Sequence, residues 1–403
     1  MNKRLKSQET GAALCLMVVA VILLTLTGMA LLNLGLQTRI SAIRTAQGIQ
    51  ARWSADAGLI KAVVEMNNKL SAKTWSDTSM PAVTNEVLFQ SEQSFSYQVD
   101  KDGGGNYTVT STGMAGSAIK RVYATMRLKG LFDSAILVKD RISLMPNTLV
   151  AGYNSQDATD TDFDLKIGTT STAAGRIPLG PGTVVEADVF VGVGGNPNTV
   201  IGAGGTITGQ KYTLHEELDF PVITPPSLPY IGTALSATSA TITLDPTGSG
   251  TYTGISLSQT GIVEIKGGDV VLYITGNINM GNGCEVIVRP GSSLTLYVDG
   301  NISADNSVGF NNQAGNVRDF QLFATGTSVQ LFNMKAKSSI FGTIYAPDVD
   351  ITLYPSAEMR GAIVGKNVTF KSGSVFYYDE SLRDNVSIDD VGARFIVKRW
   401  REE

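Results

Sequence analysis

An uncharged, apolar run near the N-terminus constrains this chain more than any other feature. It extends from Ala12 to Leu36. A helix needs about 20 residues to cross the hydrocarbon core of a bilayer, and this run exceeds that length. A cleaved secretory signal has a shorter apolar region of about 7–15 residues, which ends at a small-x-small site. Gly28-Met29-Ala30 has that spacing, but the apolar run continues past it. We therefore predict a retained transmembrane helix over residues 12–38.

Basic residues on the two flanks of this run predict its orientation. Lys3, Arg4 and Lys6 precede it, whereas Arg39 and Arg44 follow it. Basic flanks favour the cytoplasmic side of a membrane. The difference between the flanks is small, but it predicts a cytoplasmic N-terminus, with the bulk of the chain on the other side of the membrane.

The helical pattern continues beyond the membrane run. Apolar residues recur at spacings of three and four, which predicts one apolar stripe on a helix. They are Ala42, Ala46, Ile49, Trp53, Ala57, Ile60 and Val64. The first proline is Pro81. We expect an amphipathic continuation over residues 39–70, so that one helix from Ala12 to Leu70 would measure roughly 88 Å.

Four positions on this helix are candidates for packing against other helices. Gly28 and Gly35 lie seven residues apart and so share one side, where small residues allow helices to approach closely. The ordinary tolerance of membrane helices for glycine explains the same two residues equally well. Trp53 and Ala57 are the corresponding candidates on the apolar stripe.

The N-terminal segment resembles the type IV pilin class. The resemblance lies in the basic leader that ends in Glu9-Thr10-Gly11 and in the apolar helix that follows. More narrowly, residues 11–32 (GAALCLMVVAVILLTLTGMALL) and 51–63 (ARWSADAGLIKAV) are similar to PilX-type pilus assembly proteins. The resemblance implies that residues 1–11 are a leader and that a prepilin peptidase cuts between Gly11 and Ala12. It also implies other pilin subunits and inner-membrane lipid as partners.

Two positions depart from the pattern of major pilins. Those proteins usually begin with Phe after the cut and carry Glu at the fifth position, where this chain has Ala12 and Leu16. The departure argues against a bulk subunit and favours a minor or tip-located one. A single-pass anchor without processing and a type II secretion pseudopilin tip subunit remain alternatives.

Residues 71–130 predict a small antiparallel sheet. Residues 95–99 and 107–110 alternate around a glycine-rich turn, which indicates a β-hairpin. Residues 119–128 supply a further strand. A long helix followed by such a sheet matches the pilin headpiece plan that the resemblance implies.

Residues 131–382 predict a parallel β-solenoid (β-helix), because short apolar runs recur at fixed offsets. Leu272 recurs as Leu296, an offset of 24, and as Leu322, a further 26. Near the C-terminus, Gly342, Ile344, Val349 and Ile351 map onto Gly361, Ile363, Val368 and Phe370 at an offset of 19. Coils of this length stack their inward apolar residues on one another. The predicted fold is therefore mainly β.

Two other segments complete the expected organisation. A proline-rich stretch from Phe220 to Pro229 breaks the repeat and predicts an extended crossing loop inside the domain. Residues 341–382 are similar to the solenoid-like domain that often follows PilX-type N-termini. Residues 383–403 are left as a C-terminal tail.

Acidic residues offer one weak metal candidate. Asp157, Asp160, Asp162 and Asp164 lie close together, but a calcium loop that starts at Asp160 lacks the glycine at its sixth position and the Glu at its twelfth. Calcium at Asp160, Asp162 and Asp164 therefore stays a secondary hypothesis beside a solvated loop.

The remaining chemistry-bearing residues do not form a catalytic pattern. His215 is the single histidine, beside Glu216 and Glu217 without metal-ligand spacing. Four charges in the repeat region share no register: Asp269, Glu285, Arg289 and Asp299. Two cysteines are too few for a disulfide scaffold; Cys15 falls in the membrane run and Cys284 in a predicted core.

These patterns predict a minor, pilin-like subunit that is not an enzyme and carries no cofactor. It would sit in the inner membrane before assembly and in a cell-surface pilus afterwards, with a surface glycan as a further partner. A membrane-anchored solenoid adhesin or carbohydrate-active protein is the alternative. A net charge of −4 and a pI of about 5.3 argue against nucleic-acid binding.

Overall fold

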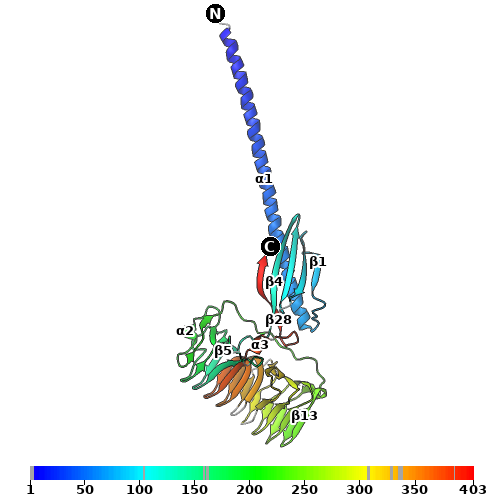
Figure 1. Ribbon diagram of the computed structural model, residues 1–403, viewed down its shortest axis with the longest axis vertical. Helices are drawn as coiled ribbons and strands as arrows, with labels where there is room; N and C mark the ends of the chain where they lie inside the picture. The colour runs from blue at the N-terminus through cyan, green and yellow to red at the C-terminus, as the bar shows by residue number, and fades with distance from the viewer. Residues whose placement is uncertain are drawn as a thin grey trace. The chain divides into compact units, whose positions relative to one another are not determined.

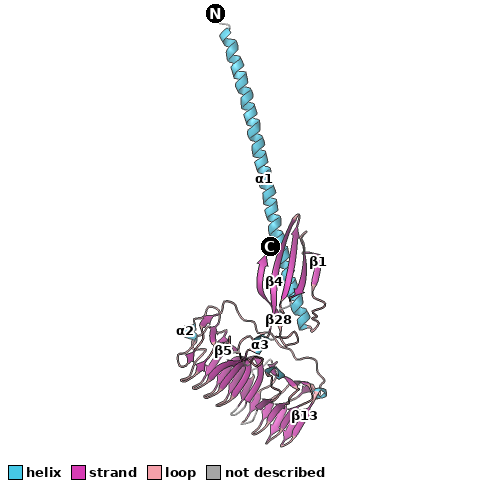
Figure 2. Cartoon of the chain, viewed as in Figure 1, coloured by secondary structure: helices cyan, strands magenta, loops and turns pink. Residues whose placement is uncertain are grey.

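The chain is mainly β, with one long helix (Figures 1 and 2). The computed structural model describes residues 4–102, 105–157, 159, 163–305, 309–326, 330–334, 339–384 and 386–403. The chain forms two compact units. Met1–Leu128 with Arg394–Glu403 form the first, which we call the helix unit, and Lys129–Ala393 form the second, which we call the parallel unit.

Helix α1 (Arg4–Ser71) is continuous over 68 residues, which corresponds to about 102 Å. The hydroxyls of Thr25, Thr27 and Thr38 donate to carbonyl oxygens three or four residues earlier, at 2.8–2.9 Å. These hydroxyls therefore keep a hydrogen-bond partner without water. The helix ends where Lys73 adopts a left-handed backbone conformation with a φ of 55°. The predicted long apolar helix is confirmed.

The helix unit contains a five-stranded sheet in the order β1-β2-β3-β4-β28 among the described residues. Its strands are β1 (Ala82–Val87), β2 (Ser94–Lys101), β3 (Tyr107–Ala115), β4 (Ala118–Lys129) and β28 (Arg394–Glu402). Strands β1 to β4 pair antiparallel in chain order, so the small antiparallel sheet is confirmed. The backbone N–H of Glu403 donates to the carbonyl oxygen of Arg121 at 3.1 Å, which places the end of β28 beside the start of β4.

Strand β28, from the segment that the sequence left as a tail, completes the core of the helix unit. Phe395 is 2% exposed, and its ring centroid lies 4.6 Å from that of Trp75 and 4.9 Å from that of Tyr107. The side chain of Asn67 on α1 accepts from the backbone N–H of Phe395 at 2.7 Å and donates to its carbonyl oxygen at 3.2 Å. The C-terminal strand is thus fixed to both the helix and the aromatic core.

The parallel unit consists mainly of short strands that pair in parallel. In chain order they are β5 (Ile136–Leu144), β6 (Leu149–Tyr153), β7 (Lys166–Thr169), β8 (Val184–Val185), β9 (Asp188–Val191), β10 (Thr206–Ile207), β11 (Lys211–Thr213), β12 (Leu235–Thr238), β13 (Thr241–Leu244), β14 (Gly250–Tyr252), β15 (Ile255–Ser258), β16 (Ile262–Ile265), β17 (Asp269–Ile274), β18 (Ile278–Met280), β19 (Glu285–Val288), β20 (Ser293–Val298), β21 (Ile302–Ala304), β22 (Gly309–Asn312), β23 (Phe320–Ala324), β24 (Leu331–Met334), β25 (Ser339–Leu353), β26 (Glu358–Phe370) and β27 (Val375–Asp379). Short helices α2 (Pro197–Val200) and α3 (Ser381–Asp384) lie between and after them. In the described part of the chain the strands form one large sheet and a second sheet of β13, β16, β19 and β22.

The strand registers of the parallel unit can be compared with the offsets at which its apolar runs recur in the sequence. Leu272 pairs with Leu296, and Leu296 pairs with Leu322, as predicted. Gly342 also pairs with Gly361, at the predicted offset of 19. The constant offset beyond that point is wrong, because Ile351 pairs with Val368 rather than with Phe370.

The register shift between Ala346 and Asp350 explains this difference. It falls around Pro347, which has no N–H to donate to a ladder. Strand β25 therefore bulges and takes up two more residues than β26.

The first strands of the parallel unit join its last strands. Strand β26 pairs with β5, so that Ile363 lies opposite Ile136, and β27 pairs with β6, so that Val375 lies opposite Leu149. Figure 1 shows β5 beside the orange-red strands of the C-terminal part of the chain. Pairing then continues from β5 to β7 and from β7 to β9. The two segments share one continuous apolar core.

The proline-rich segment covers an apolar part of the same sheet. Residues 214–234 link β11 to β12 and contain no helix or strand. Phe220 and Ile223 pack against buried side chains that include Phe323 and Tyr345. The hydroxyl of Tyr345 donates to the carbonyl oxygen of Pro221 at 2.8 Å.

Candidate functional site on the exposed helix face

The predicted apolar stripe lies on the exposed side of α1. Trp53 is 64% exposed and Ile60 is 63% exposed, and Ile49 and Val64 are similarly open. Ala57 is partly buried. The stripe is therefore not covered by any part of the chain that the structure describes, and its role in packing stays a prediction.

A second stripe, which the sequence analysis missed, packs α1 onto its own sheet. Its members are buried and recur at spacings of three and four: Ala51, Ala55, Leu59, Ala62, Met66 and Leu70. The hydroxyl of Ser111 on β3 donates to the carbonyl oxygen of Ala55 at 2.7 Å. A Cβ atom at Gly113 would lie 2.0 Å from the carbonyl oxygen of Ala51. The small size of its residues is the sequence feature that could have identified this face, since alanine, serine and glycine allow the backbones of the helix and the sheet to approach closely.

The apolar run of α1 is exposed along residues 13–36. None of its most apolar window is buried, and α1 is long and apolar enough to be a candidate membrane anchor. A Cβ atom added at Gly28 or Gly35 would meet nothing within 4 Å. Gly11 and Ala12 lie within the helical backbone, and the cut between them stays a prediction.

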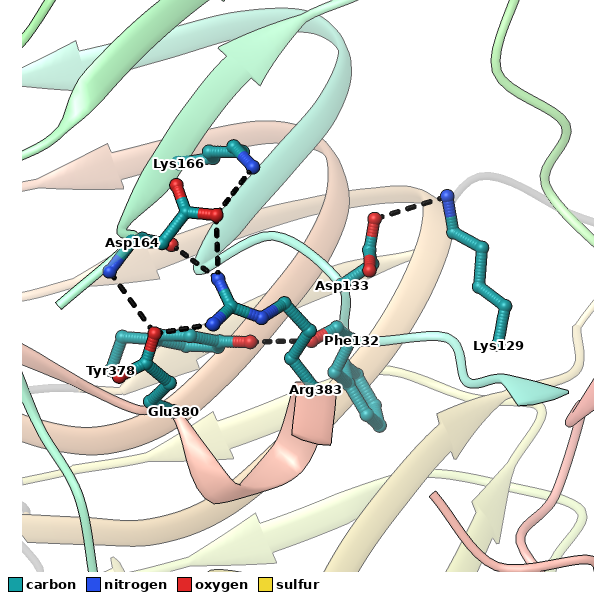
Figure 3. Close-up of polar contacts among 8 residues, drawn as sticks. All are labelled: Lys129, Phe132, Asp133, Asp164, Lys166, Tyr378, Glu380 and Arg383. Atoms are coloured by element: carbon teal, nitrogen blue, oxygen red, sulfur yellow. Dashed lines mark hydrogen bonds and ion pairs between the residues drawn. The ribbon is translucent and has the colours of Figure 1, made fainter. Parts of the chain in front are cut away.

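An ion-pair cluster connects the two ends of the parallel unit (Figure 3). Arg383 on α3 pairs with Glu380 and also with Asp164, at 3.0 Å from its carboxylate. Glu380 is 3% exposed and accepts from the backbone N–H of Asp164 at 3.0 Å. The hydroxyl of Tyr378 donates to the carbonyl oxygen of Phe132 at 2.8 Å. These contacts tie residues at the end of β27 and just after it to residues that precede β5 and β7.

This cluster also bears on the calcium hypothesis. Asp160 and Asp162 lie outside the described residues. The carboxylate of Asp164 pairs with Lys166 at 2.8 Å as well as with Arg383. No group of three or more His, Cys, Asp and Glu side chains is placed to hold a metal ion within the described part of the chain. Calcium binding here therefore gains no support.

The other charged candidates are paired across neighbouring strands. Ser293 donates to Asp269 at 2.7 Å, Asn311 donates to Glu285 at 3.1 Å, and Arg289 pairs with Glu264 at 2.6 Å. Asp299 accepts from the hydroxyls of Tyr273 and Thr325. His215 is exposed and Cys284 is buried. The structure brings these residues into cross-strand pairs and not into one site.

Two tyrosine–carboxylate pairs have perturbed electrostatics. Burial, together with the hydrogen bond to Asp299, raises the pKa of Tyr273 to about 12. In the helix unit, burial and the hydrogen bond to Glu65 on α1 raise the pKa of Tyr97 further. Both shifts favour the neutral phenol, so these groups act as hydrogen-bond donors near neutral pH.

One pocket of about 400 Å³ opens beside the proline-rich segment. Its lining includes Phe220, Pro221, Lys139 and Asp348. The amino group of Lys139 pairs with Asp348 at 2.7 Å and lies 5.2 Å from the ring centroid of Phe220. The charged groups described in its lining already neutralise each other, so the pocket offers no free acid–base pair.

Comparisons with known proteins give a partial family match. Residues 230–385 match a family described as a domain of unknown function (DUF7305). No curated protein matches the chain. Among solved structures, the competence-associated pilin ComZ from Thermus thermophilus is similar at 12% identity, over 89% of this chain and 97% of that one, with a TM-score of 0.26.

Proposed function

We propose that this protein is a minor, pilin-like subunit that is anchored in a membrane by α1 and then packs through α1 into a fibre. The observation that carries the proposal is that the two parts of one continuous helix differ in what covers them. Its N-terminal part is apolar and uncovered all round, whereas its C-terminal part buries one small-residue face on its own sheet and leaves an apolar face open.

The open face favours helices of other pilin-like subunits as its occupant. It lies on the same continuous helix as the apolar run, so one partner helix would contact both and would pass Arg39 at the junction. Burying a large apolar side chain contributes roughly 1.5–3 kcal/mol. Trp53, Ile60 and Val64 together therefore supply a substantial driving force outside the lipid. Gly28 and Gly35 would allow close approach within it.

Processing would precede assembly. We infer that a prepilin peptidase cuts between Gly11 and Ala12 and frees the helix from its leader. Leu16 stands where bulk pilins carry Glu, which supports a minor subunit. In this proposal the N-terminus lies in the cytoplasm and the parallel unit outside the inner membrane.

We also propose that the parallel unit is a β-solenoid displayed on the fibre. The consecutive parallel partners Leu272, Leu296 and Leu322 support this architecture. A single apolar core that runs from the first strands of the parallel unit to its last strands supports it as well. A rigid stack of this kind would hold its outer faces away from the cell.

N-terminal sequencing of the protein purified from membranes tests processing. We expect a mature start at Ala12 and an unprocessed protein in the Gly11→Ala variant. Normal leader removal in that variant would contradict the proposal.

Assembly is tested separately on the exposed stripe. Trp53→Glu combined with Ile60→Glu should remove the protein from a sheared-fibre fraction while it stays in the membrane. Ser41→Glu combined with Thr45→Glu is the matched control, because both residues are exposed on α1 but lie off the stripe. Undiminished fibre incorporation of the Trp53 and Ile60 double variant would count against packing through this face.

A further inference from the structure

A row of short polar side chains crosses one face of the large parallel sheet. Its members occupy the same register position in strands that pair consecutively: Ser236, Ser256, Asn279, Ser303, Asn333, Thr352 and Thr369. The residues immediately before and after each of them are buried. Since side chains alternate between the faces of a strand, these seven point away from the core. We call this set the hydroxyl–amide row.

The side chains of the row are free to bind a partner. None of them makes a hydrogen bond to any residue that the structure describes, whereas Asp269, Glu285 and Arg289 elsewhere in the unit are each paired across strands. The next residue in register, Ser143, is only 8% exposed and accepts from the guanidinium of Arg141 at 3.0 Å. The free row therefore ends at Thr369.

The geometry of the row selects the shape of its partner. Neighbouring strands lie about 4.8 Å apart, so the seven side chains span about 29 Å in a line across the strands. A pyranose ring with its linking oxygen is about as long as one such step. An extended peptide repeats its same-side residues at a longer interval, every second residue, and so falls out of register after two or three strands.

The chemistry of the row selects the same partner. Hydroxyl and amide groups both donate and accept hydrogen bonds, as sugar hydroxyls do. All seven residues are uncharged, so the row lacks the cations that binding to a phosphate backbone requires. An acidic polymer gains nothing here over a neutral one.

We propose that the hydroxyl–amide row binds an uncharged, linear polysaccharide laid across the strands, with one sugar per strand. Neutral hydrogen bonds contribute little individually in water, so affinity accumulates along the row. This inference rests on the proposed surface display for its biological setting. Binding by the purified chain does not require assembly.

Calorimetric titration of the full chain in detergent with uncharged β-1,4-linked oligosaccharides tests the proposal. Affinity should rise with each added sugar and level off near seven, the number of strands that the row crosses. Ser256→Ala, Asn279→Ala and Ser303→Ala together should weaken binding of the longest oligosaccharide by about tenfold or more.

The control variant carries three polar-to-alanine changes on the other sheet, at Thr241, Thr243 and Asn311, and should bind as the parent does. Absence of binding, affinity independent of length, equal losses in both variants, or preference for an acidic polymer or a peptide would each overturn the proposal. The Gly11→Ala variant keeps the row and should bind normally, so a failure of processing is distinguishable from a failure of this inference.

Discussion

Each unit completes its sheet with strands that are distant in sequence. The sheet of the helix unit has antiparallel strands, whereas the strands of the parallel unit pair in parallel. In the helix unit, four antiparallel strands follow one another and β28 is added after residues 129–393 have intervened. In the parallel unit, β26 and β27 pair with β5 and β6. One unit is completed by a single strand, and the other by one more step of a repeated pattern.

This difference determines where each unit is vulnerable. The helix unit depends on contacts that occur once, such as the packing of Phe395 against Trp75 and Tyr107. The parallel unit distributes its core over many similar strands, so that each contact has close equivalents beside it. Substitutions should therefore spread through the helix unit and stay local in the parallel unit.

The largest expected effect is in the helix unit. Phe395→Ala should destabilise it by about 3–5 kcal/mol, because a buried aromatic side chain is lost and a cavity remains. Hydrogen exchange should speed up throughout β1 to β4 and stay unchanged in the parallel unit. Val397→Ala on the same strand is the control, since Val397 is 47% exposed. Increased exchange in β28 alone would show that the helix unit does not depend on this strand.

The contact between α1 and β3 is the next most sensitive. Gly113→Ala should cost about 3 kcal/mol, at the upper end for overpacking, because its Cβ would meet backbone atoms of α1. Gly48→Ala is the matched control: its Cβ meets nothing within 4 Å, and alanine favours a helix by about 1 kcal/mol over glycine. Thermal unfolding of the two variants should shift in opposite directions. A parallel shift would contradict the close packing of these backbones.

Closure of the parallel unit is tested at Arg383. Among the described residues, Arg383→Ala leaves the buried carboxylate of Glu380 with only the backbone N–H of Asp164 as a partner, which should cost about 1–3 kcal/mol. The double variant Arg383→Met with Glu380→Gln should recover part of this loss, because no buried charge is left unpaired. Urea unfolding and hydrogen exchange at β5 and β6 measure the effect. Faster exchange that extends to β12 would break the comparison, since the repeat should confine the damage.

The sequence predicted the parts of the fold that repeat locally. Recurring short apolar runs located the pairs of Leu272, Leu296 and Leu322, because each coil buries the same kind of residue at the same place. Pairing between Ile363 and Ile136 was not predictable in this way, since no shared spacing links the first strand to a later one. The register shift around Pro347 was also not predictable. The apolar pattern keeps a constant sequence spacing across this point, so it does not show that β25 takes up two more residues than β26.

The candidate site was predictable only in part. The spacing of Trp53 and Ile60 identified an apolar stripe on α1, but spacing alone does not tell which stripe the protein covers itself. The answer came from small residues such as Ala51 and Ala55, which carry little hydrophobic signal and yet allow the closest contact. Sequence reasoning also missed the hydroxyl–amide row, because Ser, Thr and Asn at irregular offsets reveal a row only when the register is known.

The smallest expected effect compares a tyrosine–carboxylate pair in each unit at alkaline pH. The folded protein raises the pKa of Tyr273 to about 12, above the ordinary value of about 10 in an unfolded chain. Its contribution to stability is therefore fully present below about pH 10 and is lost as the pH rises toward 12. Tyr97 has a pKa raised further in the same direction, so its contribution should start to fall at the same pH, about 10, and the loss should continue to higher pH.

Chemical unfolding between about pH 9 and 12, with the absorbance of tyrosinate as a second readout, measures the difference. Tyr273→Phe should be slightly less stable than the parent near neutral pH, because it loses the hydrogen bond to Asp299. That gap should close as the pH approaches 12, since only the parent still has this phenol to ionise. Tyr97→Phe should also lose its gap over this range, because in both cases the phenol ionises first in the unfolded chain, at about pH 10. The absorbance of the folded protein separates the two pairs: the Tyr273 phenol should ionise as the pH approaches 12, whereas the Tyr97 phenol should stay neutral to higher pH. If both phenols ionise together in the folded protein, the deeper burial of the pair that involves α1 has no energetic consequence.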